Sequence, residues 1–304
     1  AARGGCDELC WSGLLRMLEG VPVLSLRVKV LKCFVEMSNT QAGLLETVKS
    51  TLDRLLLQVR IVLALSETEF VLRAEKGSFG VWGVLLEPFA LLITLLALRI
   101  LVRLKTTDLL DPVTWLSCGI ILLYMFRKIG INALKGVSKR QKFFFYRRIR
   151  PLDTLLASAL IEARIHGSIL VFVFAGVSFW NWQIKLDQPA LALVDFLLTI
   201  LLGLGVGISA LVVGHRIPIV KTLTKFGINR IILWTSGIFY ATYTLPGPVR
   251  PFVTWNPLLH SVELLRHSIN VAYPIPGISL QYLIVCSSLS CGFGLLFYFL
   301  NEAL

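Results

Sequence analysis

Long apolar segments alternate with short polar ones over most of the chain. A helix needs about 20 apolar residues to cross a bilayer. We predict six membrane-spanning helices, at about 85–102, 113–126, 159–180, 190–213, 231–244 and 278–300. The second segment is short, and we expect it to continue as helix beyond Phe126. The pattern therefore predicts an all-α integral membrane protein with six transmembrane helices.

The N-terminal part has a different pattern. Residues 1–36 mix charged and apolar positions too closely for a span and lack the features of a signal peptide. Because Met37 opens a more regular sequence, we expect this stretch to be a poorly structured extension or translated upstream DNA. We predict a cytoplasmic region at 37–79, with an amphipathic helix over 40–76 on the membrane surface. The alternative is a cytosolic helix packed on a partner. The spans then lie in a domain at 80–304.

A shorter helix is predicted between the fifth and sixth spans. Asn256 is a preferred N-cap residue, and Pro257 suits the first helical position, where its missing N–H is not needed. This helix ends before Tyr273 and is too short to span a bilayer. We expect it to lie at the external surface or to be re-entrant, where protein or water must cover its backbone.

The composition agrees with a membrane protein. Hydrophobic residues make up 56% of the 304 positions and charged residues 16%, against roughly 25% charged in soluble proteins. The mean hydropathy is +0.76. A soluble domain of this size rarely has such a composition, and a disordered or fibrous chain is excluded.

The positive charge indicates topology. Lys and Arg exceed Asp and Glu by 12, and nine cations lie between Arg127 and Arg150. Four more lie between Arg216 and Arg230. Because cytoplasmic loops of membrane proteins carry excess Lys and Arg, we place both stretches and both termini in the cytoplasm. We interpret the charge in this way rather than as a nucleic-acid surface, so no nucleic-acid partner is expected.

No catalytic motif stands out in the sequence. The phosphate-binding pattern GxxxxGK followed by Ser or Thr is absent, so we do not expect this chain to hydrolyse nucleotides. Four histidines are too few to indicate metal chemistry, although His260, Glu263 and His267 share a helix face. A membrane-embedded glycosyl-lipid transferase is an alternative, but it would need clustered carboxylates or histidines within the spans.

Other residues are candidates for packing or transport. In the fourth span, Gly203, Gly205 and Gly207 allow close helix packing. Charged residues inside apolar segments either pair locally or mark the edge of an aqueous pathway. These are Glu87, Arg99, Glu162 and Arg164. Aromatic residues near the predicted external mouth either form an interfacial belt or offer rings on which sugars stack. They are Phe239, Tyr240, Tyr243, Phe252 and Trp255.

Four stretches together resemble a known family. They are Gly80–Pro88 (GVWGVLLEP), Tyr146–Thr154 (YRRIRPLDT), Gly205–Gly214 (GVGISALVVG) and Trp255–Arg266 (WNPLLHSVELLR). In order and spacing they resemble the inner-membrane permease of ABC-type capsular polysaccharide exporters, within the type-two ABC exporters. The chain departs from the family at Trp82, which is shifted by one position, and at Arg148, where the family usually has proline.

The resemblance implies a working assembly in the inner membrane. Two copies of this chain, a homodimer, would pair with two ATPase subunits that bind ATP and Mg²⁺, so no cofactor is expected here. The substrate would be a lipid-linked capsular polysaccharide, with a periplasmic co-polymerase and an outer-membrane channel continuing its path. The alternatives are an O-antigen or teichoic-acid exporter and a type-two permease for a small hydrophobic compound.

The resemblance also implies two groups of site residues. Coupling to the ATPase is assigned to Arg147, Arg148, Arg150, Pro151 and Asp153. Channel or gate positions are assigned to Glu87, Pro88, Tyr240, Tyr243, Trp255, Asn256, Pro257, His260, Glu263 and Arg266. We further hypothesise that Arg250 and Arg266 lie near the exit, where they would attract charged sugars.

Overall fold

The structure is a computed structural model, and part of the chain can be described from it. The described residues are 53–54, 56–73, 89–90, 93–94, 97, 110–134, 151–181, 186–217, 219, 222–223 and 226–301. The chain forms two units, Ala1–Arg60 and Ile61–Leu304, and the second contains all the contacts discussed below. The predicted extension at 1–36 lies outside the described residues. The first predicted span lies mostly outside them, but its five described positions are helical.

Four long helices form most of the second unit. They are α4 (Pro112–Leu134), α6 (Pro151–Asn181), α7 (Pro189–Arg216) and α12 (Leu280–Leu300). Three of them begin with proline, which fits the first helical position. Within the described residues, regular structure is entirely helical, and these four helices are long and apolar enough to cross a membrane. They confirm the prediction of an all-helical membrane protein and match the second, third, fourth and sixth predicted spans.

Short elements fill the region between α7 and α12. They are the π-helix η2 (Gly227–Ile231), α9 (Ile232–Thr235), the 3₁₀ helix η3 (Thr242–Thr244), α10 (Arg250–Val253) and α11 (Pro257–Ile269). The predicted surface helix over 40–76, called the surface helix below, is helical at its described residues 53–54 and 56–73. Its apolar side chains Leu57, Leu63 and Val71 are exposed.

The predicted bounds of the fifth span are wrong. The prediction was a helix over 231–244, but the helix ends at Thr235 and bends follow over 236–240. Gly237 has φ +73°, a conformation that glycine adopts easily, and a Cβ atom there would lie 2.4 Å from Leu259 Cδ1. The chain therefore turns at Gly237 to pass closely over α11. Described positions before η2, at 219, 222–223 and 226, are also helical, outside the predicted bounds.

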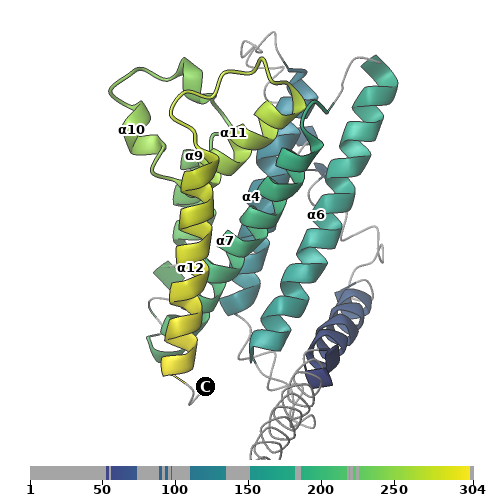
Figure 1. The fold of residues 1–304 in the computed structure, drawn as a ribbon, viewed down its shortest axis with the longest axis vertical. Helices are drawn as coiled ribbons and strands as arrows, with labels where there is room; N and C mark the ends of the chain where they lie inside the picture. Colours follow the sequence, from purple (N-terminus) through teal and green to yellow (C-terminus); the bar gives the residue numbers. More distant parts are fainter. Residues whose placement is uncertain are drawn as a thin grey trace, which may run out of the picture. The chain divides into compact units, whose positions relative to one another are not determined.

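Helix α4 is the centre of the bundle. It packs against α6, α7 and α11, and residues 120–123 are completely buried. Figure 1 shows α6, α7 and α12 as long rods, with α10 and α11 at the end where α12 begins. The outer helices keep apolar side chains exposed, such as Val171 on α6 and Phe293 on α12. In a bilayer these outward faces can contact lipid, so their exposed apolar side chains need no other protein to bury them.

Glycines bring α7 close to two neighbours. A Cβ atom on Gly207 would lie 2.9 Å from Ala133 Cβ, and one on Gly203 would lie 3.4 Å from Ile129 Cβ, both on α4. Gly205 faces α12, where a Cβ atom would lie 2.4 Å from the backbone carbon of Ser290. The missing side chains therefore set the distance between α7 and the helices on either side, as in other membrane bundles.

We expect Gly205→Ala to destabilise the protein because its methyl group would overlap the backbone of α12. Overpacking of this kind costs about 1–3 kcal/mol. The matched control is Gly292→Ala on α12, because no atom lies within 4 Å of a Cβ atom at that position. Thermal unfolding of the purified protein in detergent should show a lower midpoint for Gly205→Ala only. Equal midpoints for the two variants would contradict this packing.

Candidate functional site

Helix α11 starts with the predicted cap. The side chain of Asn256 accepts a hydrogen bond from Leu258 N at 3.0 Å, and Pro257 occupies the first turn. The prediction of this cap is confirmed. Asn256 Nδ2 also donates to Thr235 Oγ1 at 2.7 Å, which ties the start of α11 to the end of α9. Trp255, immediately before the cap, remains 82% exposed.

A buried ion pair lies on the inner face of α11. We call Glu263, Arg266, Trp115, Gly237 and Thr242 the α11 cluster. Arg266 is completely buried, and its Nη1 donates to Glu263 Oε1 at 3.1 Å and to Gly237 O at 2.9 Å. Its Nε donates to Trp115 O at 3.3 Å, and its guanidinium lies 3.7 Å from the centre of the Trp115 ring. One side chain thus joins α11, α4 and the turn after α9.

Glu263 completes this arrangement. It is completely buried and accepts a hydrogen bond from the backbone N–H of Thr242 at 3.2 Å. Burial raises the pKa of the Glu263 carboxyl, while Arg266 and the Thr242 N–H favour its charged form. A buried ion pair repays the loss of hydration only when further hydrogen bonds satisfy both partners. The backbone groups of Gly237, Trp115 and Thr242 supply three such bonds, but within the described residues Arg266 Nη2 and Glu263 Oε2 make none.

His260 links α11 to the segments on both sides of it. Its Nδ1 accepts from the backbone N–H of Ser279 at 3.1 Å, because a backbone N–H can only donate. Its Nε2 therefore carries the proton and donates to Thr254 O at 2.8 Å. The ring also lies 4.5 Å from the ring of Tyr282. Burial lowers the pKa of His260, so the neutral ring that these two hydrogen bonds require is favoured.

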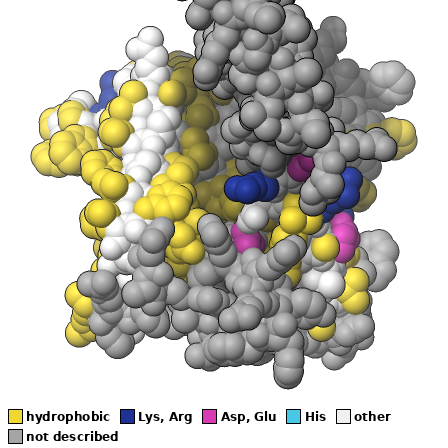
Figure 2. Space-filling view, turned by 60° about the horizontal axis from the view of Figure 1, so that its bottom comes forward, with side chains coloured by type: hydrophobic (Ala, Val, Ile, Leu, Met, Phe, Trp, Pro, Cys, Tyr) yellow, Lys and Arg dark blue, Asp and Glu magenta, His cyan; other side chains and the backbone are white. Residues whose placement is uncertain are grey.

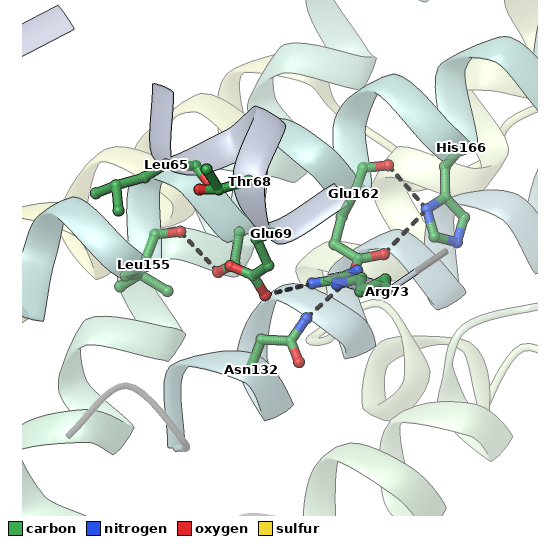
Figure 3. Close-up of polar contacts among 9 residues, drawn as sticks. Leu65, Thr68, Glu69, Arg73, Asn132, Leu155, Glu162 and His166 are labelled. Carbon is green, nitrogen blue, oxygen red and sulfur yellow. Dashed lines mark hydrogen bonds and ion pairs between the residues drawn. The ribbon is translucent and has the colours of Figure 1, made fainter. Parts of the chain in front are cut away.

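A second polar cluster lies near the other end of α4. Figure 3 shows Glu162 of α6 at its centre. Glu162 Oε1 accepts from Arg73 Nη1 at 2.7 Å and from Asn132 Nδ2 of α4 at 2.9 Å. Arg73 also pairs with Glu69 at 3.0 Å, and His166 Nδ1 lies 2.9 Å from Glu162 O. We call these five residues the α6 cluster. It joins the surface helix, α4 and α6.

An exposed ion pair runs alongside the α6 cluster. Arg164 of α6 pairs with Glu67 of the surface helix, and both side chains are more than half exposed. Figure 2, seen from nearer the end of the bundle away from α11, shows basic and acidic side chains close together beside hydrophobic ones. Glu162 and Arg164 therefore pair locally, which was one of the two predicted possibilities. The other two charged positions, Glu87 and Arg99, lie outside the described residues.

The predicted coupling residues are only partly described. Asp153 is buried in the first turn of α6, and Pro151 begins that helix. Arg147, Arg148 and Arg150 lie outside the described residues. Their role in coupling stays a prediction.

The predicted gate residues lie in different environments. Asn256, Pro257, His260, Glu263 and Arg266 come together on α11, and Tyr243 packs edge-on against Tyr273 with ring centres 5.5 Å apart. Trp255 is exposed and Tyr240 is partly buried, whereas Glu87 and Pro88 are outside the described residues. Arg266 is enclosed by protein groups of this chain, so its geometry favours holding α11 in place over contacting a polymer near an exit. Arg250 is partly exposed and donates to Leu245 O at 3.2 Å.

Sequence reasoning missed one buried polar contact between helices. Asp195 on α7 is completely buried, and the hydroxyl of Thr199, one turn later, hydrogen-bonds Ser261 of α11. A single aspartate within the apolar segment 190–213 was the signal that could have indicated it. In the part of the chain that the structure describes, no group of three or more His, Cys, Asp or Glu residues is placed to hold a metal ion.

We expect Arg266→Met to destabilise the protein strongly because it leaves the Glu263 carboxylate buried without its cation. Breaking a buried pair in this way costs about 3–5 kcal/mol. The matched control is Arg164→Gln, which removes an exposed pair and should cost about 0–1 kcal/mol. The measurement is thermal unfolding in detergent, together with the amount of protein in the membrane. The double variant Glu263→Gln with Arg266→Met should recover part of the loss, and failure to recover any would contradict the pairing.

We expect His260 to make the protein less stable in acid. Its pKa is lowered in the folded state, so its contribution is complete above about pH 6.5, the usual histidine value, and is lost as the pH falls through the folded pKa. His260→Gln should lower stability by about 1–3 kcal/mol at neutral pH, because buried hydrogen bonds weaken. Between about pH 7.5 and 5.5 its unfolding midpoint should fall less than that of the parent. Equal falls in both proteins would show that His260 is not the titrating group.

Known proteins are similar to this chain over most of its length. No family model matches the chain. The chain is 28% identical over 240 residues to the polysialic acid transport protein KpsM of Escherichia coli, covering 79% of this chain and 92% of that protein. It is 25% identical over 224 residues to the capsule polysaccharide export inner-membrane protein CtrC of Neisseria meningitidis, covering 71% and 82%.

A third relative has the same description as CtrC. BexB of Haemophilus influenzae, also a capsule polysaccharide export inner-membrane protein, is 20% identical over 213 residues, covering 70% of this chain and 80% of BexB. All three similarities extend over most of both proteins. A shared fold would produce this, whereas a single shared motif would not. They confirm the predicted resemblance, and the chain is a homologue of the inner-membrane proteins of capsule polysaccharide export.

Proposed function

We propose that this chain is the transmembrane permease subunit of an ATP-driven exporter that moves lipid-linked capsular polysaccharide across the inner membrane. The observation that carries the proposal is the similarity, over most of the chain, to KpsM, CtrC and BexB. Chemistry supports it as well. A polymer rich in hydroxyl groups cannot cross hydrocarbon, because each hydroxyl without a hydrogen bond costs several kcal/mol. It needs a continuous wet path enclosed by protein.

The working unit in this proposal is a homodimer with two separate ATPase subunits. The absence of a phosphate-binding GxxxxGK motif from the sequence supports a partner that binds ATP and Mg²⁺. The chain has six spans and cytoplasmic termini, so the α11 end faces outward. There a periplasmic co-polymerase and an outer-membrane channel continue the path. The distribution of Lys and Arg supports the topology, whereas the partners are what the resemblance to capsule-export permeases implies.

The α6 cluster supports a route from the ATPase to the spans. An ATPase that contacts the surface helix or the basic stretch before Asp153 would displace α6 and its partners together. Arg73 and Glu162 join the surface helix to α6, and Asn132 joins both to α4. Trp115, about 25 Å from Asn132 along α4 at 1.5 Å per residue, belongs to the α11 cluster. Helix α4 can therefore carry a displacement from one cluster to the other.

Deletion of the gene tests the proposed function directly. We expect the deletion strain to hold its surface glycan in the cytoplasm, with a phospholipid terminus still attached, because the polymer cannot cross the membrane alone. The measurement is the location of the glycan and the chemistry of its end. A normal surface glycan with nothing trapped inside would contradict the proposal and favour export of a small hydrophobic compound. A trapped glycan of O-antigen or teichoic-acid type would change the substrate class but keep the permease.

Complementation of this strain tests the coupling route. The parent gene and Arg164→Gln should both restore surface glycan, since the Arg164 ion pair is exposed. Replacement of Arg150 and Asp153 together by alanine should leave the protein in the membrane but stop export. If export survives in that double variant, the assignment of these residues to coupling is wrong.

A further inference from the structure

Asp195 of α7 is a buried carboxyl group with no cation to balance it. Its side chain is completely buried, and it takes part in none of the ion pairs between described residues. Neither of its carboxyl oxygens forms a hydrogen bond with a described residue. A buried carboxyl group normally pairs with a cation or becomes neutral, because an isolated buried charge is strongly unfavourable. The groups around Asp195 decide between these two states.

The helices that pack against α7 are α4, α6, α11 and α12, and their titratable groups do not supply a cation. On α4, Cys118 interacts electrostatically with Asp195, but a thiol carries no positive charge. On α6, the last titratable residue is His166, which lies in the α6 cluster. The other titratable groups at the α11 end have protein partners. Glu263 pairs with Arg266, His260 and His267 bond backbone carbonyl oxygens, and Tyr282 donates to Trp255 O.

Two buried hydroxyl groups close to Asp195 fix the direction of the hydrogen bonds between them. Thr199 Oγ1 lies 2.9 Å from the backbone oxygen of Asp195, which can only accept, so Thr199 donates its single proton there. Thr199 also contacts the hydroxyl of Ser261 on α11. Because the proton of Thr199 is already used, Ser261 is the donor in this second contact. The oxygen of Ser261 can then only accept from a further partner.

The carboxyl group of Asp195 is that further partner. The Ser261 hydroxyl lies near enough to interact with it, although the two groups are not aligned as a complete hydrogen bond. An ionised carboxylate can only accept, so it would meet an oxygen that has no proton left to donate. A protonated carboxyl group donates instead. It completes three hydrogen bonds in sequence, from Asp195 to Ser261, from Ser261 to Thr199, and from Thr199 to the backbone of Asp195.

We propose that Asp195 is a proton-binding site that holds α11 to α7. The neutral carboxyl group donates to Ser261, whereas release of the proton to water removes this bond and leaves a charge that needs water to stabilise it. An aspartate in contact with water is ionised at neutral pH. Displacement of α11 from α7 is therefore linked to loss of the proton, and binding of the proton favours the position of α11 in this structure. The inference goes beyond the proposed function and does not depend on it.

Infrared spectroscopy tests whether Asp195 holds a proton. At about pH 7, the spectrum of the purified parent minus that of Asp195→Asn should contain the carbonyl band of a protonated carboxyl group, and this band should shift in heavy water. Ser261→Ala should also shift the band, since the carboxyl group loses its acceptor. The control is Glu67→Gln, which removes an exposed, ion-paired carboxylate and should reveal no such band. A parent spectrum with no protonated carboxyl band that responds to either substitution would overturn the proposal.

The pH dependence of stability tests the same proton. The folded protein holds a proton that the unfolded chain releases above about pH 4. Between about pH 6.5 and 8.5, the unfolding equilibrium constant of the parent should rise by up to about tenfold per pH unit, the limit for one proton. The constant for Asp195→Asn should rise less, because its amide does not titrate. Equal slopes for the two proteins would contradict the proposal.

Replacement of Na⁺ by choline separates a bound proton from a bound metal cation. The unfolding midpoint of the parent should not change when only the cation of the buffer is exchanged. A decrease in the parent that is absent from Asp195→Asn would show that a metal cation balances the carboxylate, and would overturn the proposal.

Hydrogen exchange tests the link to α11. At about pH 8.5, backbone amides of residues 257–269 should exchange several times faster in the parent than in Asp195→Asn, because the ionised carboxylate no longer holds α11. At about pH 6.5 the two proteins should exchange alike. Residues 120–123 of α4, which are completely buried, are the internal control and should exchange equally in both proteins. Equal exchange of α11 in the two proteins at both pH values would overturn the proposal and leave the proposed function standing.

Discussion

The ion pair between Glu263 and Arg266 fixes the position of α11 against the rest of the bundle. Two opposite charges that are both completely buried must be held together, since either alone would be strongly unfavourable. Their remaining hydrogen bonds go to backbone groups of Trp115, Gly237 and Thr242, so these three segments must stay in place as well. The end of α9, the course of the following turn and the tilt of α11 all depend on this one interaction.

Local features of the chain were predictable from the sequence. Four apolar segments became α4, α6, α7 and α12, and the cap at Asn256 formed as its residue type predicts, because hydrophobic length and capping depend on neighbouring residues. The end of the helix at Thr235 was not predictable in the same way. Apolar residues continue beyond it, and the chain turns there where Gly237 packs against α11 and accepts a hydrogen bond from Arg266, a contact between residues far apart in sequence.

In the candidate site, too, the local features were predictable and the contacts between distant residues were not. The sequence indicated that Glu162 needed a partner, but Arg73 lies 89 residues away, and no spacing rule joins them. His260, Glu263 and Arg266 were identified as channel or gate positions, and this role stays a prediction; the structure shows that they are buried and hold α11 in place. Asp195 was overlooked, because a single polar residue in a long apolar helix has no spacing from which its contacts can be predicted. Tertiary contacts decided each of these roles.

We infer that this chain itself conducts the polymer through the membrane. The most direct measurement uses vesicles that contain the purified chain with its ATPase partner, and lipid-linked polysaccharide on the side where ATP is supplied. We expect glycan to appear on the opposite side only when both ATP and this chain are present. ATP hydrolysis without movement of glycan, or equal movement in vesicles that lack this chain, would contradict it.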